Sequence, residues 1–159
     1  MQKITPCLWF DGQAEAAANF YVSLLPDSRI ERVNRSPADT PSGPAGMVIT
    51  VEFTLAGTRY TALNGGPKYH FTEAVSFQIA CTDQAEVDRL WSALSAGGTE
   101  GPCGWLKDRW GLSWQIIPVR LYELMVDPDP DRSRRAMQAM LRMRKLNIAE
   151  LDRAADGAG

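Results

Sequence analysis

Side chains that bind metals or act as nucleophiles are scarce in this sequence. Among 159 residues there are one histidine and three cysteines. Cys7, Cys81 and Cys103 are odd in number, lie far apart and form no CxxC pair, which argues against a disulfide framework and a zinc knuckle. We expect all three to be small core residues, with a reactive thiol as the alternative. His70 is expected to pack at the surface or between modules, with a ligand or proton-transfer role as the alternative.

Excess charge and long apolar runs are also missing. The 17 basic and 19 acidic residues give a net charge of −2, so no excess of positive charge indicates nucleic-acid binding. No apolar run approaches the ~18–20 residues needed to cross a bilayer, and the N-terminal MQKITPCLWFDG lacks the apolar segment of a signal peptide. We therefore expect a cytoplasmic protein without nucleic-acid or membrane partners. The basic residues between 132 and 145 are expected to be a solvated helix face rather than an RNA contact.

What the sequence does contain is a clear order of strands and helices. Residues 3–10 read as an edge strand, and Asp11 is expected to cap the helix that follows. Residues 28–36 read as an exposed strand, and 47–56 with 58–64 read as a hairpin turned by Ala-Gly-Thr at 56–58. The order then restarts with three features: a strand at 73–82, a helix from Asp83 to Gly97-Gly98, and short strands up to 119.

This restart is reinforced by a repeat. Gln-Ala-Glu occurs at 13–15 and again at 84–86, an offset of 71. Chance similarity of two amphipathic helices is the alternative. The pattern predicts an α+β domain at 1–119, made of two βαβββ modules at about 1–66 and 70–119. A helical extension, 120–159, follows and is interrupted by Asp-Pro-Asp-Pro at 127–130.

Three segments resemble a known family: LWFDGQAEAAANFYVSLLPDSRI (8–30), NGGPKYHFTEAVSFQI (64–79) and GPCGWLKDRWGLSWQIIP (101–118). They resemble the PhnB-like proteins of the vicinal oxygen chelate (glyoxalase/bleomycin-resistance) superfamily, a branch named for a 3-demethylubiquinone-9 3-methyltransferase domain. The resemblance implies paired βαβββ modules that form a cupped mixed sheet around a cavity, and it implies a homodimer. We expect the helical extension to brace that dimer.

The resemblance also implies four positions that hold a divalent metal in the catalytic branches. Carried over to this sequence, they are Ile4, Asn64, Ser76 and Gln115. An isoleucine cannot coordinate a metal, and the other three offer only neutral oxygens. We therefore predict no metal cofactor, with a weakly bound divalent metal as the alternative.

The methyltransferase name is not supported by the residues. A site for S-adenosylmethionine usually needs a glycine-rich turn between a strand and a helix. The only glycine pairs are Gly65-Gly66, before a strand, and Gly97-Gly98, at the end of a helix.

A ligand cavity is the remaining expectation. Strand alternation predicts an inward face of polar residues with an aromatic wall at Trp105, whereas Trp114 is expected in the core. The predicted inward polar residues are Thr50, Glu52, Tyr60, Asn64, Ser76, Gln78 and Gln115. Glu52 is the candidate base, and an ion pair with Arg59 across the hairpin is its alternative.

The sequence thus favours a metal-free homodimer that binds or sequesters a small molecule. The alternative is a metal-dependent isomerase, lyase or dioxygenase-type enzyme. The identity of the ligand stays open, as does the question of whether the modules pair within one chain or between two chains.

Overall fold

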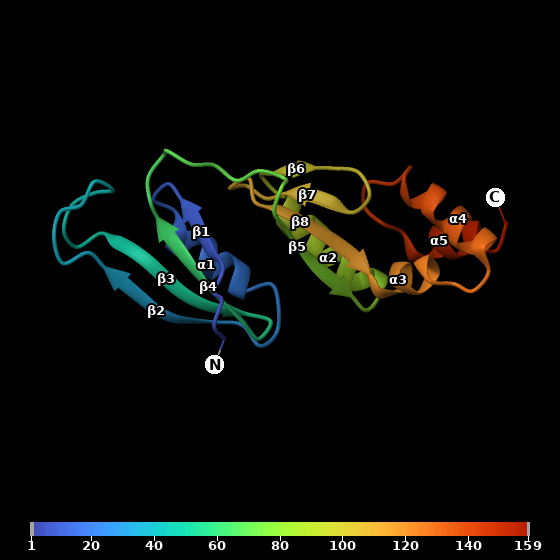
Figure 1. The fold of residues 1–159 in the computed structure, drawn as a ribbon, viewed down its shortest axis with the longest axis horizontal. Coiled ribbons are helices and arrows are strands. Elements are labelled where there is room, and N and C mark those ends of the chain that lie inside the picture. The colour runs from blue at the N-terminus through green and yellow to red at the C-terminus, as the bar shows by residue number, and fades with distance from the viewer. Residues whose placement is uncertain (1, 159) are drawn as a thin grey trace. The chain divides into compact units, whose positions relative to one another are not determined.

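The computed structural model describes residues 2–158, and the chain divides into two compact units, residues 1–71 and 72–159. Each unit contains a βαβββ module with its own mixed four-stranded sheet, and the second also carries three C-terminal helices. The α+β class and the paired modules are therefore as the sequence predicts. Figure 1 shows the helices and strands of each unit in chain order.

Unit 1 is built from five elements: β1 (Cys7–Phe10), α1 (Ala14–Val22), β2 (Arg29–Arg35), β3 (Val48–Leu55) and β4 (Thr58–Asn64). The strand order is β1-β4-β3-β2, with β1 parallel to β4 and the other neighbours antiparallel. The edge position predicted for the first strand is confirmed, because β1 has only β4 as a neighbour.

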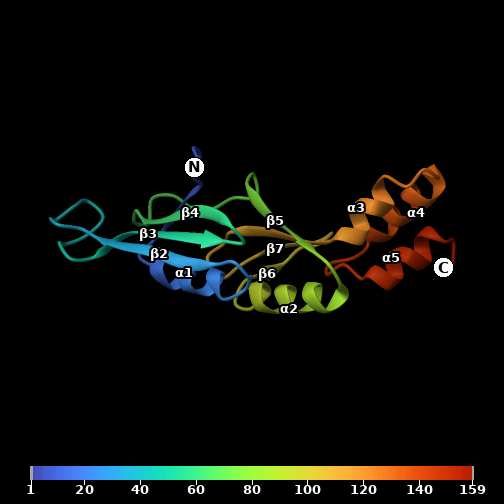
Figure 2. The same cartoon turned by 90° about the horizontal axis from the view of Figure 1, so that it is seen from below.

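One face of this sheet packs on α1, which runs along it in Figure 2. The buried strand residues Val51 and Phe53 meet the buried helix residues Ala17 and Tyr21, and the Tyr21 and Phe53 rings lie 6.4 Å apart. Alanines on the buried side of α1 allow a close approach of helix and sheet, and alternation in β3 turns every second residue away from it. The sheet of unit 1 therefore has one covered face and one open face.

Unit 2 repeats the arrangement with shorter middle strands, as predicted. Its module contains β5 (Ser76–Cys81), α2 (Gln84–Ser95), β6 (Thr99–Glu100), β7 (Trp105–Lys107) and β8 (Ser113–Pro118). The order is β5-β8-β7-β6, with β5 parallel to β8. Helix α2 covers one face of this sheet (Figure 2).

The two equivalent helices begin in different ways. Asp83 caps α2, because its carboxylate accepts a hydrogen bond from the Glu86 amide at 2.8 Å. The predicted cap at Asp11 is wrong: α1 begins at Ala14 after Gln13, which makes no side-chain cap bond. Instead the Asn64 Oδ1 of β4 accepts from the Ala14 amide at 2.8 Å. A residue 50 positions away therefore supplies the cap.

The predicted helical extension forms α3 (Val119–Met125), α4 (Pro130–Met140) and α5 (Ile148–Ala155). The break at 127–130 is confirmed, whereas the break between α4 and α5 was not predicted. The three helices share a small apolar core that includes Leu124, Leu146 and other buried residues.

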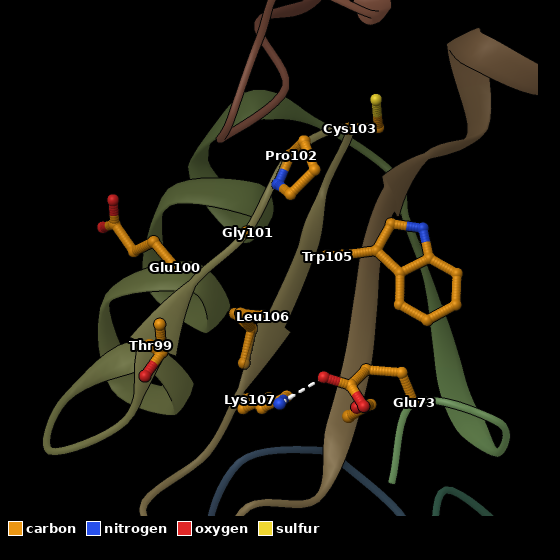
Figure 3. A pocket seen from close by; sticks show the side chains of 10 residues that line it. Glu73, Thr99, Glu100, Gly101, Pro102, Cys103, Trp105, Leu106 and Lys107 are labelled. Carbon is orange, nitrogen blue, oxygen red and sulfur yellow. Dashed lines mark ion pairs between the residues drawn. The ribbon is translucent and has the colours of Figure 1, made fainter.

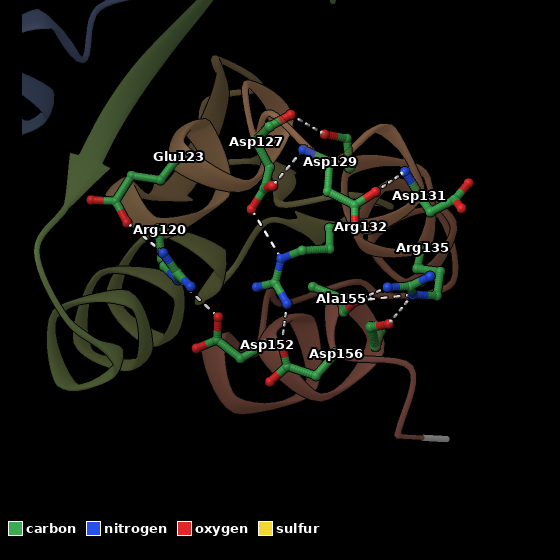
Figure 4. A network of polar contacts seen from close by, with 12 residues as sticks. Arg120, Glu123, Asp127, Asp129, Asp131, Arg132, Arg135, Asp152, Ala155 and Asp156 are labelled. Atoms are coloured by element: carbon green, nitrogen blue, oxygen red, sulfur yellow. Dashed lines mark hydrogen bonds and ion pairs between the residues drawn. The ribbon is translucent and has the colours of Figure 1, made fainter.

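The basic residues of the extension are largely engaged within it (Figure 4). Arg132 binds Asp127 at 3.0 Å and also contacts Asp156. Arg135 donates to the Ala155 carbonyl at the end of α5. The sequence predicted a solvated helix face, and the structure adds that these two arginines are paired within the extension.

Several hydrogen bonds fasten the extension to the module, among them two backbone bonds, from Cys103 to Met143 and from Gly104 to Arg144, and those of the Gln84 side chain. Gln84, at the start of α2, donates to the Leu146 carbonyl at 3.1 Å and accepts from the Ile148 amide at 2.8 Å. Nearby, Lys145 contacts Asp88 at 2.7 Å. The segment that leads into α5 is therefore held by both polar atoms of one amide group.

The cysteines only partly meet expectation. Cys81 is buried, and burial raises the pKa of its thiol to about 12. Cys103 is half-buried, and Cys7 is exposed. The prediction that all three are core residues is therefore wrong for Cys7, since its side chain lies on the open face of its sheet. Among the helices described, none is long and apolar enough to cross a membrane.

Candidate functional site

The open face of the β5–β8 sheet gathers the polar residues of unit 2. The register pairs Ser76 with Ser113 and Gln78 with Gln115, and it pairs Gln115 with Trp105 on β7. Directly paired residues share a face, so the predicted grouping of Ser76, Gln78, Gln115 and Trp105 is correct. Whether they bind a ligand stays a prediction.

These residues form a chain of hydrogen bonds. Gln115 donates to the Ser76 hydroxyl at 2.8 Å, and Gln78 donates to the Gln115 carbonyl oxygen at 3.1 Å. The amide of Gln115 is thus fixed in orientation by its two neighbours.

A cavity of about 530 Å³ lies beside this face, over β6 and β7 (Figure 3). Its volume is in the range of pockets that hold small organic ligands. Trp105 presents a half-buried indole ring to it. The lining residues are Glu73, Thr99, Glu100, Gly101, Pro102, Cys103, Trp105, Leu106, Lys107 and Ser113.

The cavity holds one ion pair and one unusual hydroxyl. Lys107 contacts Glu73, and this hydrogen bond is the main cause that lowers the pKa of the Glu73 carboxyl. Ser113 is 1% exposed, and within the described chain its Oγ is a buried side-chain oxygen that finds no hydrogen-bond partner. Buried hydroxyls are normally paired, so the Ser113 hydroxyl is an exception in the lining of this cavity.

Glu52, the candidate base, lies on the open face of the other sheet. It is half-buried, and its Oε1 accepts from Asn34 at 3.3 Å, while Asn34 also donates to Thr50 at 3.0 Å. The structure shows no ion pair between Glu52 and Arg59; Thr61 stands opposite Glu52, and Arg59 stands opposite Thr54. Glu52 and Thr50 therefore share a face, as predicted.

Tyr60 and Asn64 do not lie on the face that the sequence predicted for them. The register pairs Tyr60 with Phe53, and the two rings stack at 5.4 Å on the side of α1. Asn64 is 4% exposed and bonds Ala14 and the Val48 carbonyl. Both residues therefore lie on the covered face, away from Glu52.

The metal positions implied by the resemblance do not fit a cation. Ile4 is 84% exposed and precedes β1, and both polar atoms of the Asn64 amide are used within the fold. Ser76 and Gln115 are bonded to each other, and both are neutral. Divalent ions favour anionic or imidazole ligands converging on one point. Within residues 2–158, no group of three or more His, Cys, Asp or Glu side chains is placed to hold a metal ion.

The glycine pairs also do not fit a methyl-donor site. Gly97 follows the last turn of α2, whereas the glycine-rich turns that bind nucleotide cofactors precede the first turn of a helix. A Cβ on Gly65 would stand 2.3 Å from the Trp9 ring, so this glycine serves close packing. His70 is exposed in the connector after these residues.

Lys107, Ser113 and Glu73 were missed by the sequence analysis. The signal for two of them was present, because Lys107 is two residues after Trp105 and Ser113 two before Gln115, which puts each on the predicted face. Glu73 lies outside β5, so alternation does not place it.

The comparisons with known proteins agree with this architecture. The family described as 3-demethylubiquinone-9 3-methyltransferase matches residues 2–117. A PhnB protein from Bacillus cereus, whose description carries the same methyltransferase name, is 33% identical. The match covers 74% of this chain and 100% of that one, with a TM-score of 0.66.

Other solved structures match this chain at lower sequence identity. Protein PA1353 from Pseudomonas aeruginosa is 20% identical over 74% of this chain and 98% of that one, with a TM-score of 0.62. A lactoylglutathione lyase from Agrobacterium tumefaciens is 18% identical over 77% and 97%, with a TM-score of 0.42. The search of curated proteins found no significant match.

Proposed function

The chain belongs to the 3-demethylubiquinone-9 3-methyltransferase family of PhnB-like proteins, and we propose that it binds a small organic molecule without a metal cofactor. It holds this molecule rather than converting it. The binding site is the cavity over β6 and β7 of unit 2, beside the amides of Gln78 and Gln115. The family name alone does not extend the proposal to methyl transfer, since the glycine pairs do not fit a methyl-donor site.

The observation that carries the proposal is the cavity of about 530 Å³ with the Trp105 ring in its wall and the unpaired Ser113 hydroxyl in its lining. An aromatic wall with a few polar groups is typical of small-molecule sites. The side-chain amides of Gln78 and Gln115 beside the cavity are neutral and hydrogen-bonded, which suits recognition better than proton transfer.

Binding is tested with protein isolated from its source. A native mass spectrum should show a small molecule that is retained by the folded protein and released on denaturation. The released molecule, offered to the apoprotein, should quench tryptophan fluorescence and should be recovered unchanged. Trp105→Ala should abolish the binding, whereas Trp110→Ala, a half-buried tryptophan outside the lining residues, should retain it.

Two results contradict the proposal. If no molecule is retained and no small ligand binds, the cavity is not a binding site. If the ligand is recovered as a product, the protein is an enzyme, and the isomerase, lyase or dioxygenase-type alternative takes its place.

We also propose that two copies of the chain form a homodimer. Large apolar side chains exposed on the helical extension support this, Val126 at 79% and Leu141 at 60% among them, because such groups are often covered by a partner. Light scattering during size exclusion should give twice the mass of 17.6 kDa. A monomer at micromolar concentration would contradict the proposal.

A further inference from the structure

The unpaired hydroxyl of Ser113 is placed to receive a specific group. The residue is 1% exposed, lines the cavity and stands opposite Lys107 on β7 and Ser76 on β5. A buried hydroxyl without a partner is unfavourable unless something else satisfies it. Its Oγ is buried without a partner among the described residues, and an acceptor that reaches it from the cavity would satisfy its proton.

A lysine stands opposite this serine on the neighbouring strand. Lys107 and Ser113 are direct cross-strand partners, and the Cβ atoms of such pairs are ~4.5–5.5 Å apart on one face. A single carboxylate, with two oxygens, can therefore bond Ser113 Oγ with one and Lys107 Nζ with the other.

The present partner of Lys107 is easily replaced. Glu73 comes from the connector before β5, and its side chain is 61% exposed while that of Lys107 is 43% exposed. Ion pairs at this exposure contribute little to stability. Figure 3 shows Glu73 reaching Lys107 along the cavity, with the Trp105 ring above it. Glu73 thus occupies the place where an external carboxylate would bind.

We propose that the cavity selects aromatic carboxylates, with the ring against Trp105 and the carboxylate between Ser113 Oγ and Lys107 Nζ in place of Glu73. This inference rests on the proposed function and adds the chemical class of the ligand. The Trp105 side chain shares the face of Lys107, two residues away, so one small molecule can contact both.

The test compares two probes of the same shape, 2-naphthoate and its neutral analogue 2-naphthamide, by calorimetry on the full chain. We expect naphthoate to bind at least about tenfold more tightly, since hydrogen bonds to charged groups are the strong ones. Lys107→Met should remove this preference. Glu73→Gln should strengthen naphthoate binding, because it removes the competing carboxylate.

The Ser113→Ala variant distinguishes a role of the hydroxyl in ligand recognition from a role in folding. It should weaken naphthoate binding but leave the thermal midpoint unchanged or higher, because it deletes a buried hydroxyl that has no partner. Equal affinity for the two probes, or an unchanged preference in Lys107→Met, would overturn the inference while leaving small-molecule binding intact. Binding of neither probe would overturn the inference and would also count against the proposed function.

Discussion

Asn64 connects three parts of unit 1, and its removal should be costly. The side chain is 4% exposed, its Oδ1 accepts from the Ala14 amide at 2.8 Å, and its Nδ2 donates to the Val48 carbonyl at 3.0 Å. Asn64→Ala leaves both backbone groups without these partners. Each buried group left unpaired costs ~1–3 kcal/mol, and the loss of a helix cap costs ~1 kcal/mol. Allowing for partial hydration, we expect a loss of about 2–4 kcal/mol in the free energy of unfolding.

The measurement is urea unfolding followed by circular dichroism, with hydrogen exchange to locate the effect. Exchange should quicken most at the amides of α1. The control is Asn19→Ala, which changes an exposed asparagine of the same helix and should alter stability by less than ~0.5 kcal/mol. If Asn64→Ala is as stable as the wild type, the amide is no structural cap. A ligand-facing role for Asn64 would then regain support.

Three further predictions concern unit 2. Gln84→Ala removes the amide that bonds the segment before α5, and exchange of the α5 amides should quicken about tenfold; unchanged exchange would refute this. Gly98→Ala would set a methyl 2.0 Å from the Lys107 carbonyl oxygen and should cost about 3 kcal/mol in urea unfolding; an unshifted midpoint would count against it. The Asp129 amide and Arg132 lower the pKa of Asp127. That carboxylate therefore stabilises the fold above the unfolded pKa of ~3.9, and the stabilisation is lost as the pH falls through the lower folded value. Asp127→Asn should melt earlier than the wild type at neutral pH, with the two melting temperatures converging in strong acid.

Much of the fold could be predicted because its signals are local. The apolar stripe of α2 and the cap at Asp83 lie within a few residues of each other, and the alternation that places Trp114 in the core needs only β8. The same reasoning correctly grouped Ser76 and Gln115 on one face.

The failure at Tyr60 and Asn64 has a definite cause in the turn between β3 and β4. A three-residue turn at 56–58 would place Tyr60 on the face of Glu52. The actual turn has two residues, Ala56 and Gly57, both with positive φ, and it pairs Leu55 with Thr58. One residue of turn length reverses the face of every residue in the following strand.

The site residues missed by the sequence analysis depend on long-range geometry. The Ser113 hydroxyl lacks a hydrogen-bond partner because of all the residues that surround it in the fold. The residues next to it in the sequence do not indicate this. Likewise Glu73 belongs to a connector, where the chain follows no period. Such features need coordinates.

Helix α1 is capped by a residue of β4, whereas α2 is capped by the residue that directly precedes it. This difference affects how the chain folds during synthesis on the ribosome. Helix α2 carries its own Asp83 and can start to form once a few following residues have emerged. Helix α1 must wait for Asn64, some fifty residues downstream, before its first turn is secured. The two modules should therefore fold at different times after their residues emerge. The N-terminal module should stay unfolded longer and so remain accessible to proteases and chaperones for longer.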